Sequence, residues 1–165
     1  MKNVPTKIII HHTAIDGGDA QYSRVNEYHQ TKGFPRSSLG SFCGYHYLIE
    51  RTGNIIKARH ENEEGAHTKG QNFSSIGIGL AGNFNEKYPT IEQEAALLDL
   101  LEEVTQRWSI AATEIKYHRH FSDTDCPGYK LTNDWIKLKV ISFKLGLIKK
   151  ILIWIKEKIM NPSTR

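Results

Sequence analysis

Short apolar runs recur along the first 120 residues and predict strands. The run "KIIIHH" (Lys7–His12) is continuous and β-branched, which is typical of a buried central strand. The stretch "YHYLIERTGNIIKAR" predicts a hairpin that turns at Thr52-Gly53-Asn54, and "EIKYH" predicts a further short strand. In "IGIGLAGNF" (residues 76–84) apolar residues alternate with glycines, so we expect a strand whose backbone another group approaches closely.

Two segments show helical periodicity. The stretch "AQYSRVNEYHQTKG" places its apolar and aromatic side chains on one helical face, and Gly33 ends the pattern. In "PTIEQEAALLDLLEEVTQRW", Thr90 is suited to be an N-cap and Gln93 completes a capping box. The expected buried stripe of this second helix is Leu97, Leu98, Leu101 and Val104. The mixture of strands and helices predicts an α/β domain with a central mixed β-sheet flanked by helices.

The last thirty residues have a different pattern. From Trp135 to Met160 the chain reads "WIKLKVISFKLGLIKKILIWIKEKIM", which predicts an added C-terminal amphipathic helix. Its apolar stripe is Ile141, Leu145, Ile148, Leu152, Ile155 and Ile159. It contains no uncharged apolar run of eighteen residues, so it does not span a membrane. Two interpretations stay open: a helix packed on its own domain, or a cationic helix in contact with a membrane surface.

The charge distribution separates this segment from the rest of the chain. The net charge is +4 over 165 residues, but residues 134–165 alone carry +6, so residues 1–133 are slightly acidic. This argues against nucleic acid as a partner of the whole protein. Length and composition fit one soluble domain. We therefore expect a monomer with one folded domain over 1–133 and a cationic amphipathic helical segment over 134–165.

Cysteine usage and the N-terminus bear on where the protein works. Two cysteines, Cys43 and Cys126, are too few for a disulfide framework, although a single bridge between them stays open. The start "MKNVPTKIIIHHT" lacks the long apolar core of a secretory signal peptide. We expect synthesis in the cytoplasm, followed by release or non-classical export.

The stretch "YHRHFSDTDCPG" (residues 117–128) carries the candidate chemistry. His118 and Cys126 are eight residues apart, so one loop can bring an imidazole and a thiolate to the same ion, as zinc prefers. His11 or His12, at the end of the first predicted strand, offers a third ligand; alternate residues point to opposite faces, so only one of them reaches the site. The alternative is a polar loop with solvated histidines and an inert buried thiol.

Four ordered motifs narrow these alternatives. "IIIHHTA", "GYHYLIERTGNIIKAR", "GAHTKGQNFSSIGIGLAGNF" and "YHRHFSDTDCPG" resemble the type 2 N-acetylmuramoyl-L-alanine amidase family, over about His11 to Tyr129. That family includes phage lysozyme-like amidases and animal peptidoglycan-recognition proteins. The resemblance implies a zinc amidase fold and a groove for the peptide stem of bacterial peptidoglycan.

The resemblance also implies roles for single residues. The positions that match the family's ligands to one zinc ion are His11, His118 and Cys126. Tyr45 matches the family tyrosine beside the metal, and Thr124 stands where phage-type enzymes carry a catalytic lysine. The positions that match the lining of the groove are His67 and Asn72, with a loop held by its own hydrogen bonds as the alternative for Asn72.

Three further histidines, His12, His29 and His120, match no ligand and are expected to be structural. Gly79 and Cys126 differ from the glutamate and aspartate that the cytoplasmic recycling amidases carry at these places, so the chain resembles the lytic or recognition branches.

The resulting expectation is zinc-dependent hydrolysis of the amide between N-acetylmuramic acid and L-alanine, by a phage- or prophage-type endolysin. The first alternative is a non-catalytic module of the same fold that binds peptidoglycan without cutting it. The second is a membrane-interface protein in which the histidines are incidental.

Overall fold

The computed structural model describes residues 2–132 and 134–141. Within these residues one five-stranded sheet has the order β3-β2-β4-β1-β5. Its strands are β1 (Lys7–His12), β2 (Tyr47–Ile49), β3 (Ile55–Lys57), β4 (Ser75–Leu80) and β5 (Ile115–Tyr117). The β2–β3 hairpin is antiparallel and the other neighbours are parallel. The predicted hairpin and strands are therefore confirmed, as is the mixed character of the sheet.

Two longer helices accompany the sheet, α1 (Tyr22–Thr31) and α2 (Ile91–Trp108). Thr90 and Gln93 form the predicted capping box at the start of α2. The expected buried stripe is wrong at Leu98, which is only partly buried, whereas Leu100 is buried. The buried face runs along Leu97, Leu101 and Val104, and Leu98 lies at its edge.

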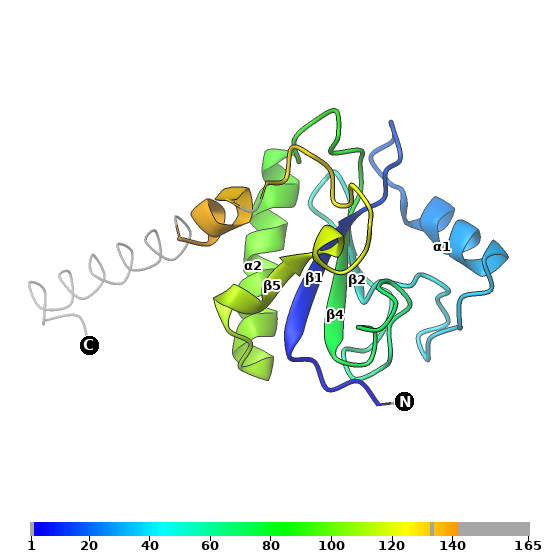
Figure 1. Ribbon diagram of the computed structural model, residues 1–165. Coiled ribbons are helices and arrows are strands. Elements are labelled where there is room, and N and C mark those ends of the chain that lie inside the picture. The colour runs from blue at the N-terminus through cyan, green and yellow to red at the C-terminus, as the bar shows by residue number, and fades with distance from the viewer. Residues whose placement is uncertain (1, 133, 142–165) are drawn as a thin grey trace, which may run out of the picture. The chain divides into compact units, whose positions relative to one another are not determined.

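The two helices lie on opposite sides of the sheet (Figure 1). His11 of β1, Gly79 of β4 and Leu48 of β2 share one register row. Leu48 packs with Val25 of α1 in one core cluster. Because successive strand residues point to opposite faces, His11 faces the α1 side and His12 the other.

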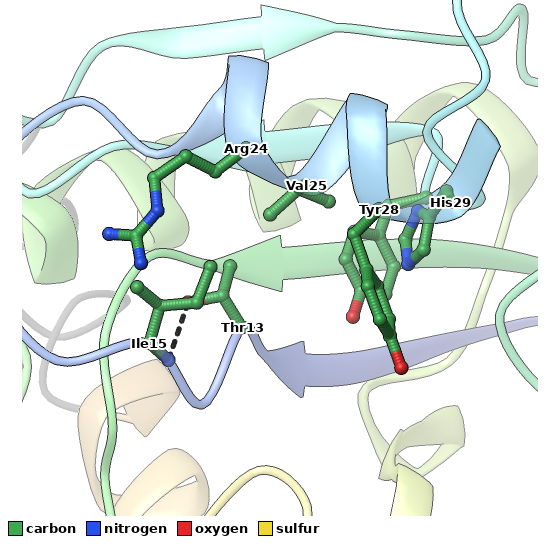
Figure 2. A pocket seen from close by; sticks show the side chains of 7 residues that line it. Thr13, Ile15, Arg24, Val25, Tyr28 and His29 are labelled. Carbon is green, nitrogen blue, oxygen red and sulfur yellow. Dashed lines mark hydrogen bonds between the residues drawn. The ribbon is translucent and has the colours of Figure 1, made fainter. Parts of the chain in front are cut away.

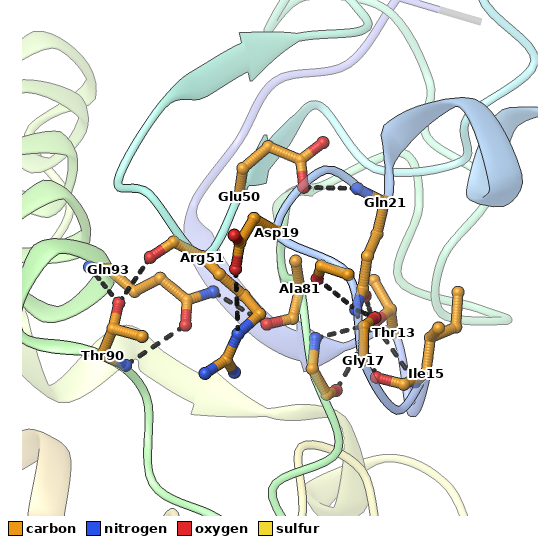
Figure 3. A network of polar contacts seen from close by, with 12 residues as sticks. Thr13, Ile15, Gly17, Asp19, Gln21, Glu50, Arg51, Ala81, Thr90 and Gln93 are labelled. Atoms are coloured by element: carbon orange, nitrogen blue, oxygen red, sulfur yellow. Dashed lines mark hydrogen bonds and ion pairs between the residues drawn. The ribbon is translucent and has the colours of Figure 1, made fainter.

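The segment that follows β1 is fixed to the start of α1 by a partly buried polar network (Figure 3). The backbone N–H groups of Gln21 and Tyr22 donate to the Glu50 carboxylate at 2.7 and 2.8 Å, which places a negative charge at the N-terminus of α1. The Gln21 side chain accepts from the Thr13 hydroxyl at 2.6 Å and donates to the Ile15 carbonyl at 3.2 Å. The chain beside the end of β1 is thereby held in one conformation.

The chain divides into two compact units, Met1–Leu131 and Thr132–Arg165. In the second unit residues 134–141 are helical, and the Trp135 N–H donates to the Thr132 carbonyl. The rest of the predicted amphipathic stripe, from Leu145 onward, lies outside the described residues. Among the described helices, none has the length and apolarity required to cross a bilayer. Separate domains over 1–133 and 134–165 stay a prediction.

Candidate metal centre

Two parallel strands end side by side and bring the first two candidate ligands together. His11 is the fifth residue of β1, and His118 directly follows β5, where it begins a short 3-10 helix (His118–His120). Cys126 comes from the loop that follows. The ligand atoms of His11, His118 and Cys126 all lie within 4.8 Å of one another. Of the two adjacent histidines, His11 is the one that reaches this cluster.

The donor set fits a zinc ion. Two imidazole nitrogens and one thiolate are the ligands of a three-residue site with an open fourth position. The Nδ1 atom of His11 lies 3.7 Å from the Sγ atom of Cys126. Nitrogen and sulfur ligands at usual zinc distances and tetrahedral angles are roughly 3.6 Å apart. The separation therefore allows both atoms to bind one ion without rearrangement.

The Cys126 loop is held in place by Arg119. Its guanidinium donates to the carbonyl oxygens of Asp125, Gly128 and Leu131. Its backbone N–H donates to the Cys126 carbonyl at 3.0 Å. Nothing in the sequence pattern singled out this arginine, because its partners are carbonyl groups and leave no side-chain signature.

Burial governs the protonation of the three candidate ligands. Burial, with the nearby His67 and His118 imidazoles, lowers the pKa of His11 well below its ordinary value. Burial also lowers the pKa of His118 and raises the pKa of the Cys126 thiol to about 12. Both imidazoles are therefore neutral and offer lone pairs, whereas the thiol needs a cation beside it to ionise.

His67 lies on the far side of His11 from Cys126. Its Nδ1 atom is 3.0 Å from Nε2 of His11, and its Nε2 atom is 3.4 Å from the Ser75 hydroxyl. Ser75 donates to the Gln71 carbonyl at 2.7 Å, so it accepts from Nε2 of His67. His67 Nδ1 then accepts from His11 Nε2, which leaves the lone pair of His11 Nδ1 facing Cys126.

The glycines of β4 make room for two of these side chains. A Cβ atom on Gly77 would come within 2.5 Å of the His67 ring, and one on Gly79 within 2.6 Å of the Tyr45 ring. This confirms that other groups approach the strand backbone closely. The alternation of glycine and isoleucine is thus part of the architecture of the site.

Tyr45 and Thr124 both lie near the ligands. The Tyr45 ring is 5.0 Å from the His11 ring, centroid to centroid. Burial raises the pKa of Tyr45, so its hydroxyl stays protonated and can donate. Thr124 Oγ1 accepts from the Cys126 N–H at 3.2 Å and so helps to shape the loop. Catalytic roles for the two residues stay predictions.

The two residues predicted to line the groove, His67 and Asn72, make contacts within the protein. His67 is buried beneath His11, as described above. Asn72 Oδ1 accepts from the N–H groups of His67 and Thr68 at 2.9 and 2.8 Å, which is the loop-holding alternative. The Thr68 hydroxyl also lies 3.3 Å from His11 Nε2, a contact that the sequence did not reveal. Substrate contact by His67 and Asn72 stays a prediction.

The three histidines that were expected to be structural have backbone partners. Each accepts a backbone N–H through Nδ1: His12 from Phe84, His29 from Gly44 and His120 from Tyr117. The alternative of a Cys43–Cys126 bridge is wrong, because both cysteines are free and buried. Cys43 belongs instead to the core cluster that includes Val25 and Leu48.

Comparison with known proteins places this geometry in context. Residues 1–129 match the family model described as N-acetylmuramoyl-L-alanine amidase. Peptidoglycan-recognition protein SC2 of Drosophila melanogaster is 33% identical over 144 residues, which cover 86% of this chain and 77% of that protein. The endolysin of Escherichia phage T7 is 30% identical over 108 residues, 62% of this chain and 70% of the endolysin.

Comparison with solved structures also finds an N-acetylmuramoyl-L-alanine amidase. The N-acetylmuramoyl-L-alanine amidase LysC from Clostridium intestinale URNW superimposes with a TM-score of 0.72 at 33% identity. The match covers 84% of this chain and 86% of LysC. The predicted fold, a central mixed sheet flanked by helices, is confirmed.

Proposed function

The chain belongs to the N-acetylmuramoyl-L-alanine amidase family, and from that premise we propose that it hydrolyses the amide between N-acetylmuramic acid and L-alanine in bacterial peptidoglycan. The observation that carries the proposal is the convergence of His11, His118 and Cys126 at one edge of the sheet. A recognition module needs no such set of ligands, whereas a metal-dependent hydrolase does.

The three residues would hold one zinc ion. When bound, zinc acts as a Lewis acid and makes water a nucleophile near neutral pH. His67, with Thr68 beside it, fixes the ring of His11 so that Nδ1 is presented as the ligand atom. Arg119 holds the loop that presents Cys126. The chain therefore supports two of its ligands by contacts outside the cluster, which tune affinity in metal sites.

Tyr45 supplies a neutral hydrogen-bond donor next to the ligands. Its hydroxyl would donate to the carbonyl oxygen of the scissile amide as negative charge develops there. Loss of one such donor typically lowers kcat by about 10²–10³. Thr124 contributes a second hydroxyl in the same loop as Cys126, with its oxygen already engaged by the Cys126 N–H.

The setting of the reaction is proposed from the relatives. Likeness to the phage T7 endolysin and to LysC supports a phage- or prophage-type lytic enzyme. We further propose that the protein is made in the cytoplasm and reaches the wall after release. The non-catalytic alternative is a peptidoglycan-binding module, which the likeness to peptidoglycan-recognition protein SC2 keeps as the second candidate.

One experiment separates the two candidates. Purified sacculi are incubated with the zinc-loaded protein, and soluble peptides are analysed by mass spectrometry for new N-terminal alanine. The proposal expects stem peptides that begin with alanine, and none from the Cys126→Ser variant. Sacculi that bind the protein but release no peptide would favour the recognition module.

A further inference from the structure

A cavity of about 440 Å³ lies between α1 and the segment that follows β1 (Figure 2). Its lining residues are Thr13, Ile15, Arg24, Val25, Tyr28, His29 and Tyr45. It adjoins the candidate metal centre through Tyr45, whose ring lies 5.0 Å from the ring of His11. A molecule whose reacting bond lies at the ligands would thus extend into this space.

Arg24 gives the cavity its charge. The lining contains no carboxylate, and Arg24 is its one side chain with a permanent positive charge. In Figure 2 the guanidinium turns from α1 toward Ile15, at the opposite end of the cavity from His29. It makes no hydrogen bond or ion pair with any residue that the structure describes, so it is available to an anion.

The rest of the cavity is preformed. Thr13 Oγ1 donates to Gln21 Oε1 at 2.6 Å and accepts from the Gly82 N–H at 2.9 Å. Val25 is buried in the core cluster, and Ile15 packs against that cluster. Binding here needs little ordering of the wall, which favours affinity.

We propose that this cavity is a subsite for an anionic group, in which Arg24 binds the first free carboxylate of the peptide stem. The inference rests on the proposed function. The lactyl carboxyl group of N-acetylmuramic acid is consumed in the scissile amide, and L-alanine carries no acid. The first carboxylate beyond the bond is therefore the α-carboxyl of the second stem residue, a γ-linked D-glutamate that some walls leave free and others amidate. A guanidinium pairs with a carboxylate through two parallel hydrogen bonds, which the amide of D-isoglutamine cannot reproduce.

The subsite predicts a preference that two small substrates test. The probes are N-acetylmuramoyl-L-alanyl-γ-D-glutamyl-L-alaninamide and its D-isoglutamine counterpart, in which the γ-carboxyl is bound in an amide and only the α-carboxyl differs. Both are assayed with the zinc-loaded full chain. We expect kcat/KM to favour the acid by about tenfold, the size of one charge-assisted hydrogen-bonded pair at a partly exposed site. In Arg24→Gln this preference should vanish, with little change for the amidated probe, and Arg24→Lys should restore part of it. Lys87→Gln removes an exposed charge outside the cavity lining and should keep the full preference.

Two results would overturn the subsite. One is an equal kcat/KM for both probes with the unaltered protein. The other is a fall in kcat/KM in Arg24→Gln that is equally large for both probes. If neither probe is cut, the Kd of each intact probe, measured by calorimetry, still tests Arg24, and the sacculus assay decides separately whether the proposed hydrolysis fails. A tenfold tighter Kd for the acid that is lost in Arg24→Gln supports the subsite without catalysis, and equal Kd values reject it.

Discussion

At the scale of single residues, the site depends on contacts that reach one layer beyond the ligands. The clustering of His11, His118 and Cys126 was expected from the resemblance to the amidase family, because the spacing of His118 and Cys126 alone left a polar loop open as an alternative. The role of His67 could not be predicted, since it depends on the register of β1 against β4. Gly77 pairs with Ile9, two residues before His11, and its missing side chain admits the His67 ring. Spacing alone carries no such information.

Replacement of His67 by Asn should weaken zinc binding. The change removes the acceptor that orients His11, and loss of such partners typically lowers metal affinity by about 10–100-fold. The Kd for zinc is measured by competition with a chromophoric chelator, and circular dichroism checks folding. His60→Asn, at an exposed histidine, is the matched control. An unchanged zinc Kd in a folded His67→Asn protein would remove His67 from the support of the site.

Tyr45→Phe tests the donor beside the ligands. The ring remains and still fills the space over Gly79, so zinc content should stay at the level of the unaltered protein. We expect kcat to fall by about 10²–10³ because one oxyanion donor is lost. Tyr88→Phe, at an exposed tyrosine, should keep full activity. Full activity in Tyr45→Phe would exclude the hydroxyl from the reaction.

At the scale of elements, hydrophobic periodicity accounted for most of the fold. The five strands and the two long helices were predictable because their apolar spacing matches the period of each element. Side-chain hydrogen bonds and ion pairs between elements were not predictable, because the residues that form them lie far apart in the sequence. Glu61, which follows β3, is an example. Its carboxylate accepts hydrogen bonds from Tyr47 of β2 and from Arg107 and Trp108 of α2.

Glu61→Gln should destabilise the fold in a pH-dependent way. Burial opposes ionisation of Glu61, but hydrogen bonds from Tyr47 and Trp108 and the charge of Arg107 outweigh it, so its pKa lies below the ordinary value. Its stabilisation is therefore full above the unfolded-state pKa and is lost as the pH falls through the folded-state pKa. At pH 7 we expect the free energy of unfolding to drop by about 1–3 kcal/mol, measured by urea denaturation.

The matched control for Glu61 is Glu103, which contacts the same arginine from an exposed position one helical turn away. Glu103→Gln should change the free energy of unfolding by less than about 0.5 kcal/mol. The difference between the unaltered protein and Glu61→Gln should shrink as the pH falls below about 4, because the unfolded-state carboxyl is then protonated. A difference that persists undiminished in acid would contradict the role of the Glu61 charge.

At the scale of the whole molecule, two parts of different charge share one chain. The family match covers residues 1–129 and stops before the cationic segment. Sequence periodicity predicts that segment as an amphipathic helix, and of it the structure describes residues 134–141. We propose that this segment contacts anionic membrane surfaces, as a helix with lysines along its polar face would.

Removal of residues 135–165 tests whether the cationic segment contacts a membrane and is not needed for hydrolysis. If the segment contacts the membrane, the shortened protein should cut purified sacculi at the rate of the full-length protein but lyse intact cells more slowly. A full-length variant with Lys149 and Lys150 changed to Gln should show the same contrast in milder form and guards against misfolding of the shortened chain. Equal losses on sacculi and on cells would instead make the segment part of the fold.

The claim on which the account rests is that His11, His118 and Cys126 bind one zinc ion. The most direct test is the zinc content of the purified protein, dialysed after exposure to excess zinc and measured by elemental analysis. The account predicts one zinc per chain, and none in His118→Ala or Cys126→Ser. A zinc-free, folded protein under these conditions, or variants that retain the full amount, would contradict it.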